Sequence, residues 1–175
     1  MPGYAEILTN ADIENLAADL ETPLPAVSDW TPTEIAATLT QSADYQPADA
    51  PIFDADPLNL FLVVETGDHH VSIVDGDTFE VLKRLPTPFA VHGGPKFTPD
   101  GRYTFIMSRD GSVQKIDLWS LGEVGRVRAA INSRNIAISA DGKWLAVANY
   151  LPRTLTILSS EDLSLARVFQ VVDLH

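Results

Sequence analysis

The chain has 175 residues, about one ordinary domain, and with 45% hydrophobic and 21% charged residues it is too apolar to be intrinsically disordered. Its 12 basic and 24 acidic side chains give a formal net charge of −12, which disfavours nucleic acid and anionic membrane surfaces as partners. Cysteine is absent and no apolar run is longer than five residues. These facts exclude disulfides, covalent c-type haem attachment within this chain, and a membrane helix, which needs about 20 apolar residues.

The first 22 residues predict a short loop followed by one helix. Thr9 and Asp12 have the spacing of a capping box, and Pro23 ends the helix because proline cannot continue it. Between them, apolar residues recur with helical spacing at Ile13, Leu16, Ala17 and Leu20. Because an isolated helix of about three turns is marginal in water, we expect this stripe to pack against another part of the protein.

Residues 23–55 are predicted to form a proline-rich linker, because half of the chain's twelve prolines lie between positions 23 and 57. Thr31, Pro32 and Glu34 predict the start of a short helix near Ile35 to Leu39, with a cap, a proline at the first position and a capping glutamate. The extended stretch after this helix is expected to lie along a domain surface and to carry no chemistry.

From residue 56 onward, short predicted strands recur with a fixed period. The segments Val71–Asp75, Val113–Asp117 and Leu155–Ser159 begin 42 residues apart, and the similar segments Pro99–Met107 and Ala140–Ala148 begin 41 apart. Periods of about 40–45 residues with four strands per unit are typical of β-propeller blades. A β-sandwich is the competing fold, but a sandwich has no reason to keep such a period.

We therefore predict a mainly β chain: a partial β-propeller of about three four-stranded blades at residues 56–175, preceded by a short α-helical segment. Gly94–Pro99 would form the innermost strand of one blade. Residues 56–175 supply fewer than three complete blades, whereas a closed propeller needs roughly four to eight. The chain is accordingly expected to be a fragment, or to need other copies to close.

One rim of this predicted propeller collects the residues with the richest chemistry. Neighbouring strands of a propeller blade run in opposite directions. The turn between the second and third strands of a blade therefore lies on the same rim as the connection that leads into the innermost strand. On it lie His69, His70, His92, Arg109, Arg134, Asn135, Tyr150 and Arg153. Several cations gathered on one rim of an acidic chain indicate an anionic ligand.

His92 gives the strongest signal on this rim, because Gly93 and Gly94 follow it and allow backbone or a flat ligand to approach closely. Two interpretations stay open for His92: a ligand-binding residue, and a hydrogen-bonded structural histidine. Adjacent residues on an extended segment point opposite ways, so at most one of His69 and His70 faces the central opening.

The remaining charged residues also have structural explanations. Arg109 is equally well explained by an ion pair with the neighbouring Asp110. Lys96, on the innermost strand, must either extend to solvent or meet a carboxylate. Solvated strand charges are expected at Arg84, Arg126, Arg128 and Arg167.

The segments Phe89–Arg102, Ser108–Gly111, Asn132–Ser139 and Ala148–Pro152 resemble the haem d1-binding eight-bladed propeller of cytochrome cd1 nitrite reductase and its biosynthetic relatives. The resemblance covers about residues 56–175. The forms His-Gly-Gly-Pro-Lys at 92–96 and Glu-Thr-Gly-Asp-His-His at 65–70 look closer to the dihydro-haem d1 dehydrogenase of haem d1 biosynthesis than to the reductase. That resemblance implies oxidation of a precursor propionate to the acrylate.

The N-terminus is similar to the end of a class I cytochrome c domain, which makes residues 1–22 a C-terminal remnant of such a domain. The resemblance rests on Met1-Pro-Gly-Tyr4 and the helix that follows. It implies Met1 as an axial ligand of a haem c iron, whereas an initiator methionine explains the residue equally well. Haem c is implied only for the full-length protein, since this chain lacks the attachment cysteines.

Carried over residue by residue, the resemblance implies His92 as the axial ligand of the haem d1 iron. Arg109 and Arg134 match positions that hold the carboxylates of the macrocycle, to which guanidinium groups bind strongly. Lys96, Asn135 and Tyr150 are implied as further cofactor-binding residues. The catalytic residues stay unknown, because the distal side belongs to blades that this chain lacks.

The implied function is that of a periplasmic haem d1-binding oxidoreductase, similar to dihydro-haem d1 dehydrogenase, that passes electrons to haem c; the fragment alone is expected to be inactive. The alternatives are cytochrome cd1 nitrite reductase, which reduces nitrite to nitric oxide, and a non-catalytic propeller that binds a ligand or a partner protein. The implied partners are a tetrapyrrole and either cytochrome cd1 nitrite reductase or a small electron-transfer protein, with no nucleic acid or membrane among them. No secretory signal is visible in this chain.

Overall fold

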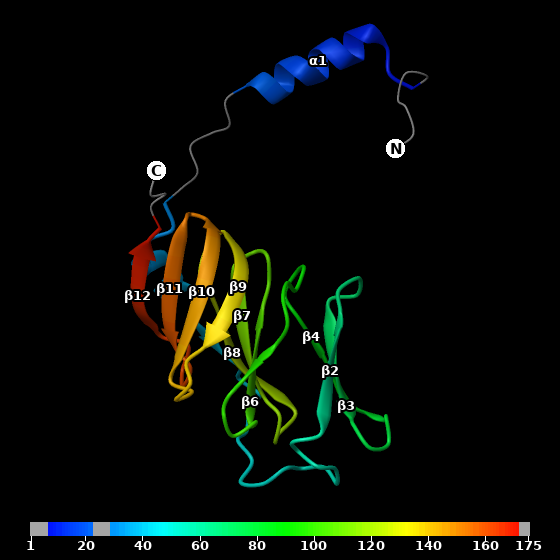
Figure 1. The fold of residues 1–175 in the computed structure, drawn as a ribbon, viewed down its shortest axis with the longest axis vertical. Helices are drawn as coiled ribbons and strands as arrows, with labels where there is room; N and C mark the ends of the chain where they lie inside the picture. The colour runs from blue at the N-terminus through cyan, green and yellow to red at the C-terminus, as the bar shows by residue number, and fades with distance from the viewer. Residues whose placement is uncertain (1–6, 23–28, 172–175) are drawn as a thin grey trace.

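A computed structural model describes residues 7–22 and 29–171 and shows a mainly β fold, in which three antiparallel sheets stand side by side like neighbouring propeller blades (Figure 1). The first sheet has the order β2 (Leu60–Glu65), β3 (His70–Asp75) and β4 (Val81–Pro86). The second contains β5 (Lys96–Phe97), β6 (Tyr103–Met107), β7 (Ser112–Asp117) and β8 (Gly122–Arg128). The third contains β9 (Asn132–Ile138), β10 (Trp144–Leu151), β11 (Thr154–Ser159) and β12 (Leu165–Gln170).

The predicted repeat is confirmed at the level of single residues. The corresponding strands β3, β7 and β11 begin at positions 70, 112 and 154, a period of 42 residues. The Asp-Gly turns recur as well: Gly101 and Gly142 have φ of +73° and +74°, the left-handed region that glycine occupies without strain. The innermost strand predicted over Gly94–Pro99 is shorter, because Pro95 and Pro99 on either side of β5 cannot donate to the ladder.

Two apolar clusters fill the spaces between neighbouring blades. Successive side chains of β6 point to opposite faces of its sheet and belong to different clusters. Phe105 and Met107 pack towards the third blade, while Ile106 packs towards the first. All three side chains are at most 1% exposed. The middle blade is therefore buried on both faces, and the clusters hold the three sheets together through the hydrophobic effect.

The proline-rich segment contributes a side chain to this core in addition to lying on the surface as expected. It forms α2 (Pro32–Ala37), which begins at the predicted cap and proline and ends two residues before Leu39, and Ile35 is 1% exposed in the cluster between the second and third blades. The strand β1 (Thr40–Gln41) pairs with β8 and extends the second sheet to five strands. Trp30 Nε1 donates to the carbonyl of Arg128 at 3.2 Å.

The N-terminal helix α1 (Asn10–Glu21) begins with the predicted capping box, since Asp12 N donates to Thr9 Oγ1 and Thr9 N donates to the Asp12 carboxylate. Its apolar stripe is exposed, however, with Ile13 48%, Leu16 50% and Leu20 85% accessible. The packing expected for this stripe does not occur within the described residues. Among the helices that the structure describes, none has the length and apolar character that crossing a membrane requires.

The burial of Ile35 leads to a first prediction. Replacing Ile35 by alanine should lower the free energy of unfolding by about 2–4 kcal/mol, because the change leaves a cavity between two blades. Urea unfolding followed by tryptophan fluorescence measures this loss. Ile13→Ala, the same change on the exposed stripe of α1, should stay within about 0.5 kcal/mol of the wild type. Equal effects of the two changes would contradict the role of α2 in the core.

Candidate functional site

Backbone hydrogen bonds join the three blades along one rim. The segment 87–95 leads from β4 to β5 and contacts the end of β6 and the turn that follows it: His92 N donates to Met107 O at 2.9 Å, and Arg109 N donates to Ala90 O at 3.0 Å. The carbonyl of Arg109 accepts from Ser133 N on β9 at 3.2 Å. The peptide of Arg109 thus bridges the segment 87–95 and the third blade, and it brings the backbones of His92, Arg109 and Arg134 together.

The imidazole of His92 is exposed, and its Nδ1 lies 2.9 Å from the carbonyl oxygen of Arg134. Because a carbonyl oxygen only accepts hydrogen bonds, Nδ1 carries a proton, and in the neutral form of the ring Nε2 then has the lone pair. A neutral imidazole oriented in this way is the form in which histidine binds a metal. Gly93, with φ +76°, would place an added Cβ 3.5 Å from Asn135 Oδ1, so the left-handed backbone is the reason for glycine here.

Arg134, Asn135 and Tyr150 were expected in loops, and this placement is wrong. Arg134 and Asn135 lie on β9, and Tyr150 lies on β10, because the ladder between these strands continues through two register shifts almost to the rim. The strand position fixes their spacing: the Arg134 guanidinium carbon lies 4.9 Å from the centre of the Tyr150 ring. This cation–π contact leaves both side chains exposed.

The surroundings of Arg109 and Lys96 differ from those that we inferred from the sequence. The carboxylate of Asp110 accepts from Ser112 N at 3.0 Å, and within the described residues it forms no ion pair with Arg109. The guanidinium of Arg109 is exposed. Lys96 Nζ donates to the carbonyl of Gly94 at 2.8 Å, so its ammonium meets a backbone oxygen rather than a carboxylate.

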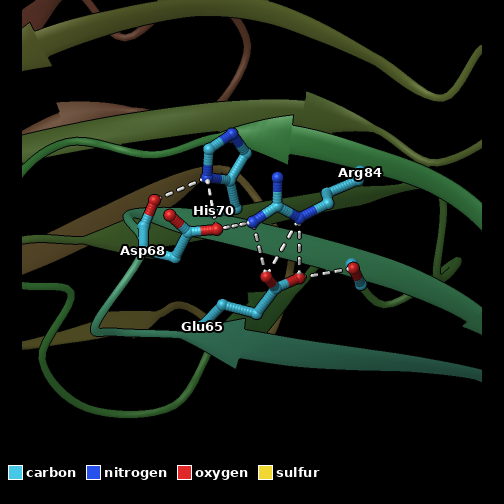
Figure 2. Close-up of polar contacts among 5 residues, drawn as sticks. Glu65, Asp68, His70 and Arg84 are labelled. Carbon is cyan, nitrogen blue, oxygen red and sulfur yellow. Dashed lines mark hydrogen bonds and ion pairs between the residues drawn. The ribbon is translucent and has the colours of Figure 1, made fainter.

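A network of charged side chains lies at the rim end of the first blade (Figure 2). Arg84 donates to the Glu65 carboxylate through Nε at 2.9 Å and Nη2 at 2.7 Å, and it also donates to Asp68. Ser72 Oγ donates to Glu65 at 2.6 Å, and His70 Nδ1 lies 2.6 Å from the carbonyl of Asp68. Arg84 is exposed, as expected of a solvated strand charge, but it departs from that expectation in being ion-paired, because the register of β3 and β4 places it opposite Ser72 and within reach of Glu65.

Two other arginines also depart from the expectation of solvated charges. Arg126 pairs with Glu123 at 2.6 Å, and Arg128 Nε donates to the carbonyl of Asp110 at 2.7 Å. Arg167 lies 4.6 Å from the ring of Phe169. In the described part of the chain, Arg109 and Arg134 have exposed guanidinium groups with neither a carboxylate nor a backbone carbonyl as partner.

The Arg84 guanidinium, and after it the Ser72 hydroxyl, hold the pKa of Glu65 below its ordinary value, and Glu65 raises the pKa of Arg84. Because the folded state lowers the pKa of Glu65, this pairing stabilises the fold above the ordinary carboxyl pKa. The contribution is lost as the pH falls through the lowered value.

Replacing Arg84 by glutamine should therefore raise the pKa of Glu65 towards its ordinary value, which a carbon-13 NMR titration of the side-chain carboxyl measures. Arg167→Gln removes an arginine that contacts an aromatic ring instead, and it should leave the pKa of Glu65 unchanged. A Glu65 pKa that is insensitive to Arg84→Gln would show that the ion pair is not formed in solution.

The donor set at the rim fits an iron-centred macrocycle that carries acidic side chains. One exposed imidazole presents a free Nε2, the atom that an axial ligand needs. Two exposed guanidinium groups offer paired N–H donors to carboxylates. Met1, the residue considered for a haem c iron, lies outside the described residues.

Comparison with known proteins places the chain in one family. The model of the Cytochrome D1 heme domain matches residues 55–175, more than half of the chain. The chain is 47% identical over 174 residues to the dihydro-heme d1 dehydrogenase of Pseudomonas aeruginosa, covering 99% of this chain and 35% of that protein. It is 29% identical over 116 residues to the nitrite reductase of Stutzerimonas stutzeri, covering 63% of this chain and 20% of that protein.

Solved structures agree with this relationship. The structure of dihydro-heme d1 dehydrogenase NirN in complex with DHE has a TM-score of 0.83 and 47% identity, and it covers 98% of this chain and 37% of that one. The β-propeller domain of Cps50 (Swd1) from Myceliophteria thermophila, at a TM-score of 0.56 and 17% identity, covers 69% of this chain and 42% of that one, and it shares the fold alone. The repeat, the rim and the family match agree: the chain belongs to the Cytochrome D1 heme domain family.

Proposed function

We propose that these three blades form part of a propeller that binds haem d1 or its dihydro precursor on the rim described above, with His92 as an axial ligand of the iron. The observation that carries this proposal is the hydrogen bond between His92 Nδ1 and the carbonyl of Arg134, which fixes the tautomer and leaves Nε2 available. Arg109 and Arg134 would hold acidic side chains of the macrocycle, with Lys96, Asn135 and Tyr150 beside them.

The proposed reaction is that of a dihydro-haem d1 dehydrogenase, in which a propionate side chain loses two electrons and two protons and becomes an acrylate. The 47% identity to the P. aeruginosa dehydrogenase favours this reaction over nitrite reduction, since the identity to the S. stutzeri nitrite reductase is 29%. The bound macrocycle would supply the redox chemistry, and the residues of this chain would bind and orient it.

The chain spans 35% of the length of the P. aeruginosa dehydrogenase, so the activity is proposed for a protein that carries these blades within a complete propeller. In our proposal such a protein acts in the periplasm and passes the electrons to a haem c, and the three blades alone are inactive. A cytochrome cd1 nitrite reductase or a small electron-transfer protein would be its protein partner.

The axial role of His92 is tested by His92→Ala in a protein with the complete propeller. Mixed with haem d1, the variant should lose the absorption bands of a histidine-ligated iron, because alanine offers no ligand atom. His70→Gln serves as the control, since the ring of His70 is engaged with Asp68, and it should keep the wild-type spectrum. A wild-type spectrum in His92→Ala would remove the axial assignment.

The exposed guanidinium groups of Arg109 and Arg134, which have no carboxylate partner among the described residues, give a separate prediction about affinity. Arg109→Gln and Arg134→Gln should each raise the dissociation constant for haem d1 about tenfold, because a charged hydrogen bond to a carboxylate is lost. Visible absorption titration measures this change. Arg167→Gln, which removes an arginine outside the rim, should bind like the wild type, and equal affinity in all four proteins would contradict the carboxylate-binding role.

A further inference from the structure

The turn between β2 and β3 holds a histidine in a conformation for which the second blade uses glycine. His69 has φ +54°, and the residue one period of 42 later is Gly111, with φ +87°. The two turns are built alike, since Thr87 N donates to His69 O at 2.8 Å and Ala129 N donates to Gly111 O at 2.8 Å. Because glycine satisfies this turn in the second blade, the backbone does not require a histidine.

Surrounding contacts hold His69 in this conformation. Left-handed backbone is unfavourable for residues with a side chain, although histidine tolerates it better than most. Such conformations persist where neighbours enforce them, and they concentrate at functional sites. Here Arg84 binds both Glu65 and Asp68, which precede His69 in the turn, and Asp68 N donates to Glu65 O at 3.1 Å. The network of Figure 2 therefore fixes the turn that presents His69.

The structure also separates the two adjacent histidines, which the sequence left undecided. The ring of His70 is turned towards Asp68, as Figure 2 shows. The ring of His69 lies 5.3 Å from the ring of Phe89 and is exposed. Within residues 7–22 and 29–171, neither ring nitrogen of His69 has a hydrogen-bond partner. His69 is thus the member of the pair that can meet a ligand.

The neighbours of His69 connect it with the rim. Phe89 belongs to the segment 87–95, whose Ala90 accepts from Arg109 N and whose His92 presents Nε2. His92 precedes β5, the strand at one edge of the second sheet, whereas His69 lies on the turn between β2 and β3. The segment 87–95 thus contacts His69 through Thr87 and Phe89 near its start and carries His92 three residues after Phe89, so both histidines lie along one stretch of the rim.

From this arrangement, and resting on the proposed function, we propose that His69 donates a hydrogen bond to a carboxylate at the edge of the bound tetrapyrrole. An imidazole has an N–H to donate in either protonation state, and a hydrogen bond to an ionised acceptor is roughly twice as strong as one between neutral groups. His69 is therefore a binding residue for the acidic edge of the ligand, distinct from the iron ligand His92.

The test is His69→Gly in a protein with the complete propeller, titrated with haem d1 and followed by visible absorption. The dissociation constant should rise about tenfold. The thermal midpoint of the ligand-free protein should be unchanged or higher, because glycine is the residue that the second blade has in this turn. His70→Gln is the matched control and should keep the wild-type affinity.

Esterified ligand identifies the group that His69 contacts. With haem d1 whose carboxylates are methylated, His69→Gly and the wild type should bind equally, since the ionised acceptor is gone. An unchanged affinity for haem d1, an equal loss with the esterified ligand, or a midpoint lowered by several degrees would each overturn the inference. These outcomes are independent of the His92→Ala spectrum, so a failure of the axial assignment is recognised separately.

Discussion

The hydrogen bond from His92 Nδ1 to the carbonyl of Arg134 is the contact on which the candidate site depends. Its two residues are 42 positions apart, which is the period of the blades. The bond therefore exists only if consecutive blades stand in register, as the apolar clusters on both faces of the middle blade ensure. Packing between blades thus determines which nitrogen of an exposed imidazole remains free, a link from the hydrophobic core to the chemistry of the rim.

The fold was predictable where its determinants are local or periodic. The repeat predicted the strands, and the Asp-Gly turns predicted where strands end. Thr9 and Thr31 predicted where the two helices begin. The role of Ile35 was not predictable, because helix propensity says nothing about the sheet on which a helix packs. The partner of the α1 stripe was unpredictable for the same reason: an amphipathic pattern indicates a contact without identifying it.

The site was predictable to the extent that it follows from blade topology. The repeat placed His92, Arg109 and Arg134 on one rim, but it misplaced Arg134 and Tyr150 in loops, because register shifts let β9 and β10 continue to the rim. The sequence did not predict the ion pair of Arg84 with Glu65, because the two residues are 19 positions apart and lie on different strands. Their contact depends on the register of three strands, which alternation in the sequence does not fix.

The partners of the carboxylates at the rim determine which of its cations are free to bind an anion. The chain carries twice as many acidic as basic side chains, so the number of bases alone would not favour an anionic ligand. At the rim, however, Asp110 is occupied by the backbone of Ser112, and Glu65 is occupied by Arg84. In the described residues neither carboxylate forms an ion pair with Arg109 or Arg134. Local hydrogen bonds therefore decide which cations of an acidic chain are left without a carboxylate partner and can bind an anionic ligand.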